Sequence, residues 1–457
     1  MKTEKPGINY KIIYFISFTL VLLLLVCLQS PAYSSSIPVQ RLTPEVEIGR
    51  KVYEQIKPHL KFTRNPLIKY YLEKIGNNIL DNLPRNDYEF RFFPIKANDI
   101  NAFALPNGYI FVTNRLIQAC DSEDELAFVL CHEIAHVMRG HFMNYLSQKR
   151  KTDMTTLALI VLGALAAQDR DLQEALPALG LGINQNITLS YSRGQEYEAD
   201  TYGLRYLHQA GFSEEGAAQF MNKLRILSQI TISLPVYLST HPMPVDRLVN
   251  LKRFTESSSC DPSRPCISNI NRLKLWCRLE TELSDRLLSD LTPVYSHNPD
   301  DIDTVYGLAL VYEKLGSSDE AEKYYMKGLS INPEDGDVLR DYAIFLYRRA
   351  LLKDAEDKLK LAIKSNPEDP LAHHYLGRIL MDQKRNKEAI DEFLKSVEVC
   401  SGFPDNHHFL GILYSQQGDE EKSHKSFERY FALIGNQKAA RLHSQKKERI
   451  SRRNEEE

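Results

Sequence analysis

The chain has 457 residues, of which 43% are hydrophobic and 26% are charged. A chain of this length and apolar content can bury more than one core, so two domains are expected. The formal net charge is -3 at pH 7, which argues against nucleic acid as the main partner.

The first 34 residues have the order of a targeting segment. Lys2, Lys5 and Lys11 precede an apolar run at 12–28, and small residues follow at 30–36. This order is typical of a secretory signal peptide and predicts a protein that works outside the cytoplasm. The apolar run is just short of a comfortable membrane span, so an uncleaved inner-membrane anchor is the alternative.

The segment HEIAH at 132–136 has the spacing of a metal-binding helix. A helix places residues i and i+4 on one face, so His132 and His136 can bind one metal ion. Glu133 is then placed to take a proton from an attacking water molecule. The flanking residues are apolar, as a ligand helix buried in a core requires. A chance match to a short motif is the alternative, and a further ligand elsewhere in the chain would exclude it.

That further ligand is expected in the segment EYEAD at 196–200. Two histidines leave zinc short of a third protein ligand, which is normally a carboxylate or another histidine. If this segment is helical, Glu196 and Asp200 share one face and Glu198 points elsewhere. Glu196 is therefore the predicted third ligand, and Asp200 is predicted to accept a hydrogen bond that orients a ligand histidine. Glu198 is expected to be solvated or ion-paired.

HEIAH followed by EYEAD resembles the family-48 zinc metallopeptidases, in which the first glutamate of the second motif binds zinc. The segment at 101–113, NAFALPNGYIFVT, resembles the family strand that forms the edge of the active-site cleft. Asn107 replaces the usual first glycine of that strand's turn, and asparagine tolerates the left-handed geometry. The resemblance implies that a substrate strand pairs with the backbone of five residues. These are Asn101, Ala102, Phe103, Ala104 and Leu105.

The segment STHPMPVDR at 239–247 resembles the THP loop of the same family, which implies that His241 lies near the zinc. There it would stabilise the transition state or occupy the open coordination site; an ordinary loop histidine is the alternative. His141 is expected to lie behind the ligands or at the surface. The resemblance covers about 40–255 and implies an α+β zincin-type domain, helical with a small edge-strand sheet, that binds one zinc ion.

Two segments between the zinc motifs are expected to shape the site. Residues 154–167 are apolar nearly all round but too few to cross a bilayer. A helix buried near the active site is favoured, and contact with a membrane surface is the alternative. Residues 176–182 are expected to form a mobile connector that would suit a lid.

The cysteines fit an oxidising compartment. Cys260 and Cys266 are predicted to close a disulfide loop in a linker at 256–270. Two free thiols, or a bridge to Cys277, are the alternatives. Cys131, beside the metal helix, is expected to be a small buried core residue.

From residue 271 to 435 the sequence is repetitive, which predicts an α-solenoid. Asn-Pro pairs at 298, 332 and 366 recur at the tetratricopeptide spacing of 34. Matching small residues are Ala309, Ala343, Gly377 and Gly411 in the first helix of each unit, and Ala321, Ala355 and Ala389 in the second. About four repeats are expected, with a concave surface that docks proteins; a purely stabilising role is the alternative. The charged tail at 436–457 is expected to be a solvated helix end or a disordered segment.

The whole chain is therefore expected to be mainly α. The order of signal peptide, zinc domain and repeats resembles one subgroup of the family that works in the bacterial periplasm. That resemblance implies degradation of unfolded or misassembled outer-membrane proteins, chaperone-like help to their assembly, and docking of the repeats on the assembly machinery. Peripheral contact with a membrane is also compatible with it. Two alternatives stay open: a mainly non-proteolytic assembly factor, and an inner-membrane-anchored quality-control peptidase.

Overall fold

A computed structural model describes most of the chain from Pro44 onward. The described residues are 44–84, 88–148, 157–158, 161–163, 190–230, 236–242, 247–251, 266–267 and 269–456. The predicted signal segment and the predicted connector at 176–182 lie outside them. Among the described helices, none combines the length and the apolar character that crossing a membrane requires.

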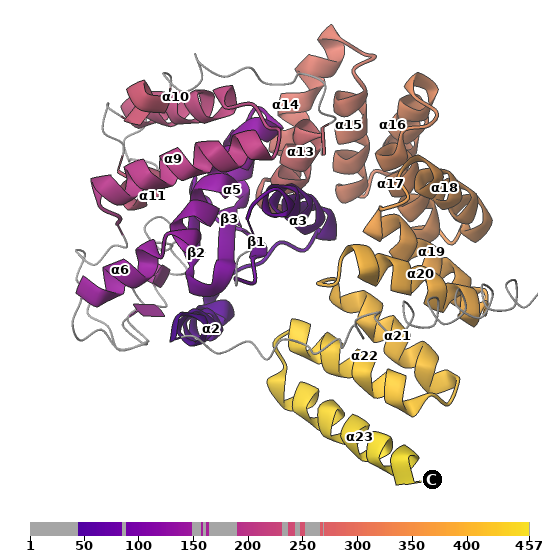
Figure 1. Cartoon of the computed structure of the whole chain (residues 1–457). Helices are drawn as coiled ribbons and strands as arrows, with labels where there is room; N and C mark the ends of the chain where they lie inside the picture. The colour runs from indigo at the N-terminus through magenta and orange to yellow at the C-terminus, as the bar shows by residue number, and fades with distance from the viewer. Residues whose placement is uncertain are drawn as a thin grey trace, which may run out of the picture. The chain divides into compact units, whose positions relative to one another are not determined.

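A small sheet lies near the start of the described chain (Figure 1). Its elements, with the helices that precede it, are α2 (Pro44–Ile56), η1 (Lys57–His59), α3 (Pro66–Asp81), β1 (Arg91–Ile95), β2 (Ala102–Leu105), η2 (Pro106–Gly108) and β3 (Tyr109–Thr113). The strand order is β1-β3-β2, with β1 parallel and β2 antiparallel to β3. The predicted edge strand is therefore confirmed as β2.

The turn between β2 and β3 requires left-handed backbone. Asn107 has φ 67° and Gly108 has φ 83°. A Cβ at Gly108 would lie 2.8 Å from the Cα of Phe90, so glycine is required there on steric grounds as well. Asparagine at 107 adopts the conformation that the sequence predicted for it.

Helices complete the first core around α5. They are α4 (Asn114–Ala119), α5 (Glu123–Met138), α6 (His141–Gln148), α9 (Arg193–Gln209), α10 (Glu215–Ile230) and α11 (Val236–Thr240). The Ser122 side chain caps α5 by accepting a hydrogen bond from the backbone N–H of Glu125 at 3.2 Å. Nearly every residue of α5 is buried, which agrees with its apolar flanks. Helix α9 starts with a capping box of Ser192 and Gln195 and lies along α5 (Figure 1).

Four of the five described residues of the predicted apolar segment at 154–167 are buried, and the fifth, Gly163, is half-buried. Leu157, Ala158, Val161 and Leu162 pack in one cluster with the aromatic face of the sheet. Phe103 and Phe111 of that face stack with ring centroids 4.7 Å apart. For these four residues the buried alternative is confirmed.

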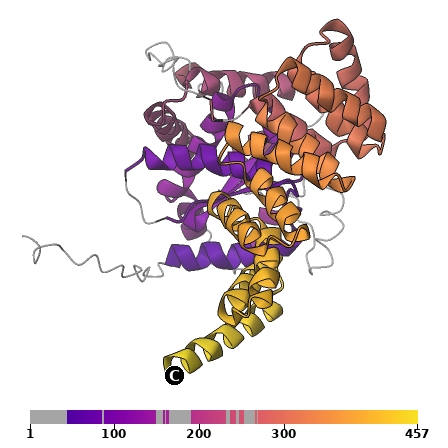
Figure 2. The same ribbon diagram turned by 90° about the vertical axis from the view of Figure 1, so that its right-hand side faces the viewer.

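Helix pairs follow in the second half of the described chain (Figures 1 and 2). They are α13 (Ile270–Thr281) and α14 (Ser284–His297), α15 (Ile302–Lys314) and α16 (Ser318–Ile331), α17 (Gly336–Arg348) and α18 (Leu352–Ser365), α19 (Pro370–Asp382) and α20 (Asn386–Val399), and α21 (Pro404–Gln416) and α22 (Glu420–Leu433). Asp301, Asp335 and Asp369, 34 residues apart, cap the first helices of successive units. The predicted repeat architecture is confirmed.

Helix α13 contributes to two cores at once. Leu273, Trp276 and Cys277 pack in the core around α5, and Leu275 packs in the core of the repeats. The indole N–H of Trp276 also donates to the hydroxyl of Tyr306 on α15 at 3.0 Å. The helix that starts the repeats is therefore built into the preceding domain.

The C-terminal tail is helical, which was one of its two predicted alternatives. Residues 437–456 form helix α23 (Gln437–Glu456), and Lys447 pairs with Glu428 of α22 at 2.6 Å, so the helical alternative holds.

Cys266 has a free, exposed thiol, so the predicted disulfide to Cys260 is not present; Cys260 itself lies outside the described residues. Cys277 is also free and is buried, because it packs in the first core, which excludes the alternative bridge.

Candidate active site

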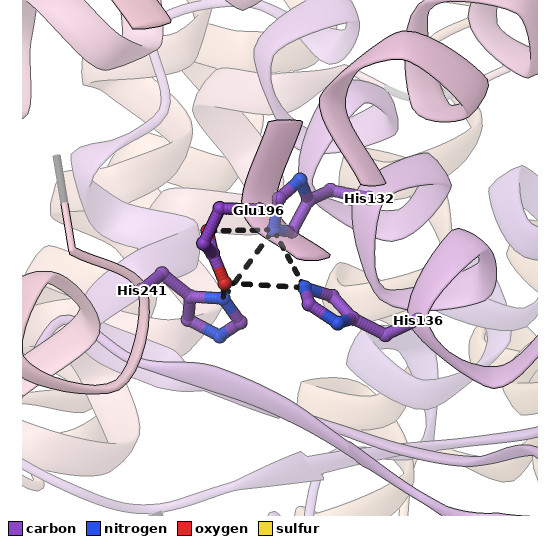
Figure 3. A group of neighbouring side chains, drawn as sticks. All are labelled: His132, His136, Glu196 and His241. Carbon is purple, nitrogen blue, oxygen red and sulfur yellow. Dashed lines mark hydrogen bonds and ion pairs between the residues drawn. The ribbon is translucent and has the colours of Figure 1, made fainter. Parts of the chain in front are cut away.

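Four buried side chains from three parts of the chain converge on one point (Figure 3). His132 and His136 come from α5, Glu196 comes from the first turn of α9, and His241 follows α11. One ligand atom from each of the four lies within 4.8 Å of all the others. The three predicted metal ligands are therefore brought together, with His241 beside them.

The distances within this cluster show how the donor atoms are aimed. The Nε2 atoms of His132 and His136 lie 3.0 Å apart. Oε1 of Glu196 lies 3.5 Å from Nε2 of His136 and 3.0 Å from Nδ1 of His241. Nδ1 of His241 is also 3.3 Å from Nε2 of His132. Such an arrangement of imidazole nitrogens and a carboxylate can hold a divalent metal ion.

Electrostatics favour the metal-binding forms of two ligands. Burial opposes the charge of Glu196, but His241 and the hydrogen bonds of the three histidines hold its pKa well below the ordinary value. Burial also holds the pKa of His136 well below the ordinary value. These shifts favour the anionic form of Glu196 and the neutral form of His136, which are the forms that metal ligation requires.

Glu133 is buried next to the cluster but takes no hydrogen bond. Neither of its carboxylate oxygens has a hydrogen-bond partner among the described residues. The closest ionisable contact is Nε2 of His241, 3.5 Å from Oε1. Burial raises the pKa of Glu133, which moves this carboxylate toward the range of a general base.

Asp200 lies against the first ligand, and its predicted role of orienting that ligand stays a prediction. Its Oδ1 lies 3.0 Å from Nδ1 of His132, so the other ring nitrogen is directed at the cluster. The guanidinium of Arg247 holds the same carboxylate through two bonds of 2.7 and 2.8 Å. Arg247 lies in the motif that pointed to His241, but the sequence assigned it no role.

His141 lies behind the second ligand and not at the surface. Its Nδ1 is 2.9 Å from Nδ1 of His136, and its Nε2 is 3.2 Å from Oε2 of Glu198. Glu198 is about one-third exposed and pairs with Arg139 at 2.5 Å, as expected for a residue on the opposite face of α9. Glu198 is therefore linked to His136 through His141.

Comparison with protein families agrees with this geometry. Residues 66–255 match the model of peptidase family M48, which spans both ligand helices and the loop of His241. The chain carries an M48 peptidase domain. Residues 302–335 and 343–405 match tetratricopeptide-repeat models, so the M48 domain is followed by these repeats.

Several curated proteins are similar in sequence to this chain. The beta-barrel assembly-enhancing protease of Yersinia pestis is 28% identical over 256 residues, which are 54% of this chain and 52% of that protein. A putative protease of the same name from Vibrio cholerae is 27% identical over 288 residues, 61% of this chain and 58% of that protein. The mitochondrial metalloendopeptidase OMA1 of Bos taurus is 30% identical over 207 residues, 42% of this chain and 39% of that protein.

The matched stretch spans about half the length of the first of these relatives. Among solved structures, the chain is similar to PilW, a type IV pilus biogenesis factor, with a TM-score of 0.33 and 17% identity over 40% of this chain and 93% of that one.

Two buried tyrosines flank the cluster in the M48 domain, and the sequence did not single them out. Tyr191 stacks on His136 with ring centroids 4.0 Å apart, and Tyr237 stacks on His241 at 4.5 Å. Within the described part of the chain, neither hydroxyl has a hydrogen-bond partner. Both had a local signal: Tyr191 stands next to the serine that caps α9, and Tyr237 stands four residues before His241, which is a helical spacing.

The predicted substrate-binding strand lies beside the metal helix of the M48 domain. Ala104 and Leu105 line a narrow cavity together with His136, Phe142 and Tyr191. Strand β2 pairs with β3 on one side, and the described residues provide no strand on its other side. Asn101 precedes the strand, and its backbone N–H donates to the Thr113 hydroxyl at 3.1 Å. All four residues of β2 are buried, and the pairing of this strand with a substrate stays a prediction.

Proposed function

We propose that this chain is a zinc-dependent endopeptidase. The observation that carries the proposal is the buried cluster of His132, His136 and Glu196 with the carboxylate of Glu133 beside it, whose oxygens have no hydrogen-bond partner among the described residues. Two imidazoles and one carboxylate suit zinc in a catalytic site that keeps a position open. When bound, the zinc ion would polarise the scissile carbonyl and lower the pKa of water.

Glu133 performs the proton transfers in this proposal. Its buried carboxylate accepts a proton from the attacking water and later delivers it to the leaving amine nitrogen. The absence of competing hydrogen bonds among the described residues leaves both oxygens available for this work. Asp200 and His141 hold the rings of His132 and His136 in place, so the ligands do not have to reorganise.

The substrate in this proposal is an extended segment of an unfolded protein. Residues 101–105 would pair with it through backbone atoms of β2, which selects for an extended conformation more than for a sequence. The names of the relatives from Yersinia pestis and Vibrio cholerae refer to β-barrel assembly. We extend this to the present chain as a proposal: it acts on misassembled outer-membrane proteins in the periplasm, with the repeats docking on the assembly machinery.

The test compares cleavage of an unfolded β-barrel outer-membrane protein with cleavage of the same protein after folding. Wild type is expected to cut the unfolded form, and a chelator is expected to stop it until zinc is returned. Glu133→Gln is expected to cut neither form. Equal cleavage of both forms would contradict the substrate proposal, and cleavage that survives the chelator would contradict the zinc proposal.

The position of His241 favours a second candidate, a latched enzyme or assembly factor with little proteolysis of its own. Its Nδ1 lies among the ligand atoms, 3.0 Å from Glu196 and 3.3 Å from His132, where it can occupy the fourth coordination position. His241→Ala distinguishes the two candidates. Faster cleavage by this variant supports the latch, and slower cleavage supports a role of His241 in catalysis.

A further inference from the structure

Besides α5, two chain segments contribute a side chain to the cluster: α9 contributes Glu196, and the residues after α11 contribute His241. Arg247 contacts both of these segments. Its guanidinium is almost completely buried, with 3% of the side chain exposed. On the α9 side it binds Asp200 through Nε and Nη2 and approaches Oε2 of Glu196 with Nη1, at 2.6 Å. On the other side, Nη1 donates to the carbonyl oxygen of Pro242 at 2.9 Å and lies 3.5 Å from that of His241.

The two oxygens of Glu196 have different surroundings as a result. Oε2 lies 2.6 Å from Nη1 of Arg247 and 3.6 Å from Nε2 of His132. Oε1 instead lies 3.0 Å from Nδ1 of His241 and 3.5 Å from Nε2 of His136. A carboxylate that is engaged by a guanidinium through one oxygen has only the other oxygen ready for a metal ion. A carboxylate free to use both oxygens would fill an additional coordination position, which a catalytic zinc site keeps open.

We propose that Arg247 is a positioning residue that makes Glu196 a single-oxygen metal ligand and fixes the loop of His241 against it. The inference rests on the proposed zinc site, but it concerns how the site is held. Through its two bonds to Asp200 the same guanidinium also fixes the carboxylate that orients His132. One side chain therefore sets the geometry of two ligands and the position of the loop histidine.

The test measures zinc affinity by chelator competition, and the absorption spectrum of Co²⁺ in place of zinc, for wild type, Arg247→Gln and Arg247→Lys. Arg247→Gln is expected to weaken zinc binding about 10- to 100-fold, as is typical when a residue supporting a metal ligand is lost. Its Co²⁺ absorption is expected to be weaker than that of wild type, because a two-oxygen Glu196 raises the coordination number. Arg247→Lys keeps the charge but cannot make the paired bonds to Asp200, so its affinity is expected to lie in between.

Arg272→Gln is the matched control, because it also removes a buried guanidinium from a set of carboxylates, here Asp303, Asp335 and Asp337 of the repeats. It is expected to leave zinc affinity and the Co²⁺ spectrum unchanged. The inference about Arg247 would be overturned if Arg247→Gln kept the zinc affinity and the Co²⁺ spectrum of wild type, or if Arg272→Gln lost as much zinc affinity as Arg247→Gln. Either result would leave the proposed zinc site unaffected. Wild-type protein that binds no zinc would instead contradict the proposed function together with the inference.

Discussion

Gly203 on α9 lies directly against the backbone of His132 on α5. A Cβ atom built at Gly203 would be 3.3 Å from both the Cα and the N of His132. Because Gly203 has no side chain, the backbones of α9 and α5 approach closely at this point. This close approach brings α9 near enough to α5 for Glu196 and Asp200 to reach the histidines.

Gly203→Val is therefore expected to push α9 away from α5 and to weaken metal binding. Gly194 lies in the first turn of the same helix and has open space within 4 Å, so Gly194→Val is the matched control. Chelator competition with zinc is the measurement. The close-approach argument fails if both variants bind zinc as tightly as wild type.

Asp200→Asn is expected to lower zinc affinity by about 10- to 100-fold, because His132 loses the charged acceptor that fixes its ring. Glu198→Gln is the comparison on the same helix: Glu198 contacts the site only through His141, and it is partly exposed. Its zinc affinity is expected to change less. An equal effect of the two substitutions would show that the ring of His132 does not depend on Asp200.

In the repeats, Arg340 is fully buried among the carboxylates of Asp337, Asp341 and Asp369. Arg340→Met is expected to destabilise the repeat domain by about 3–5 kcal/mol, because it leaves Asp341 and Asp369 buried without a counter-charge. Asp337 keeps its pair with Arg272. Lys323→Met removes an exposed partner of Glu320 and is expected to leave the stability unchanged. Urea unfolding of both variants measures the difference, and similar midpoints would contradict the prediction.

His374 predicts an acid-sensitive step in the stability of the repeats. Burial lowers its pKa to about 4, although Asn406 accepts a hydrogen bond from the ring at 2.7 Å. In the unfolded chain this histidine takes up a proton near its ordinary pKa, whereas in the folded chain it stays neutral until the pH is much lower. Between these two pKa values protonation therefore stabilises only the unfolded chain. Stability is therefore lost as the pH falls from about 6.5 toward 4, by about 1.4 kcal/mol per pH unit for this group.

The check is urea unfolding at several pH values in that range. His374→Gln can keep a hydrogen bond to Asn406 but cannot titrate, so its stability should depend less steeply on pH than that of wild type. Parallel pH profiles for the two proteins would assign the acid sensitivity to other groups.

Much of the site could be predicted because it depends on helical periodicity. His132 and His136 share a face by their spacing, and Glu196 and Asp200 do so on α9, so their convergence needed only the two helices to meet. The repeat helices follow from the spacing of 34 in the same way.

The parts that escaped prediction depend on tertiary contacts. Arg247 reaches Glu196 through a tertiary contact between segments far apart in the sequence, and no local pattern encodes that contact. Tyr237 is an exception, because it stands four residues before His241 and the helical spacing places both rings on one side; what was missed there is the short helix itself. Helix α13 was assigned to the repeats, whereas Trp276 packs in the first core, which the repeat period alone does not reveal.

The most direct test of the central claim is to measure the zinc content and casein cleavage of Glu133→Gln and Glu196→Gln on the same samples. The account predicts that Glu133→Gln keeps its zinc and loses cleavage, because Glu133 moves protons and does not hold the metal. Glu196→Gln is predicted to lose both, because an anionic ligand is replaced by a neutral amide. Full cleavage by Glu133→Gln, or full zinc content with full cleavage in Glu196→Gln, would contradict the assignment of these two residues.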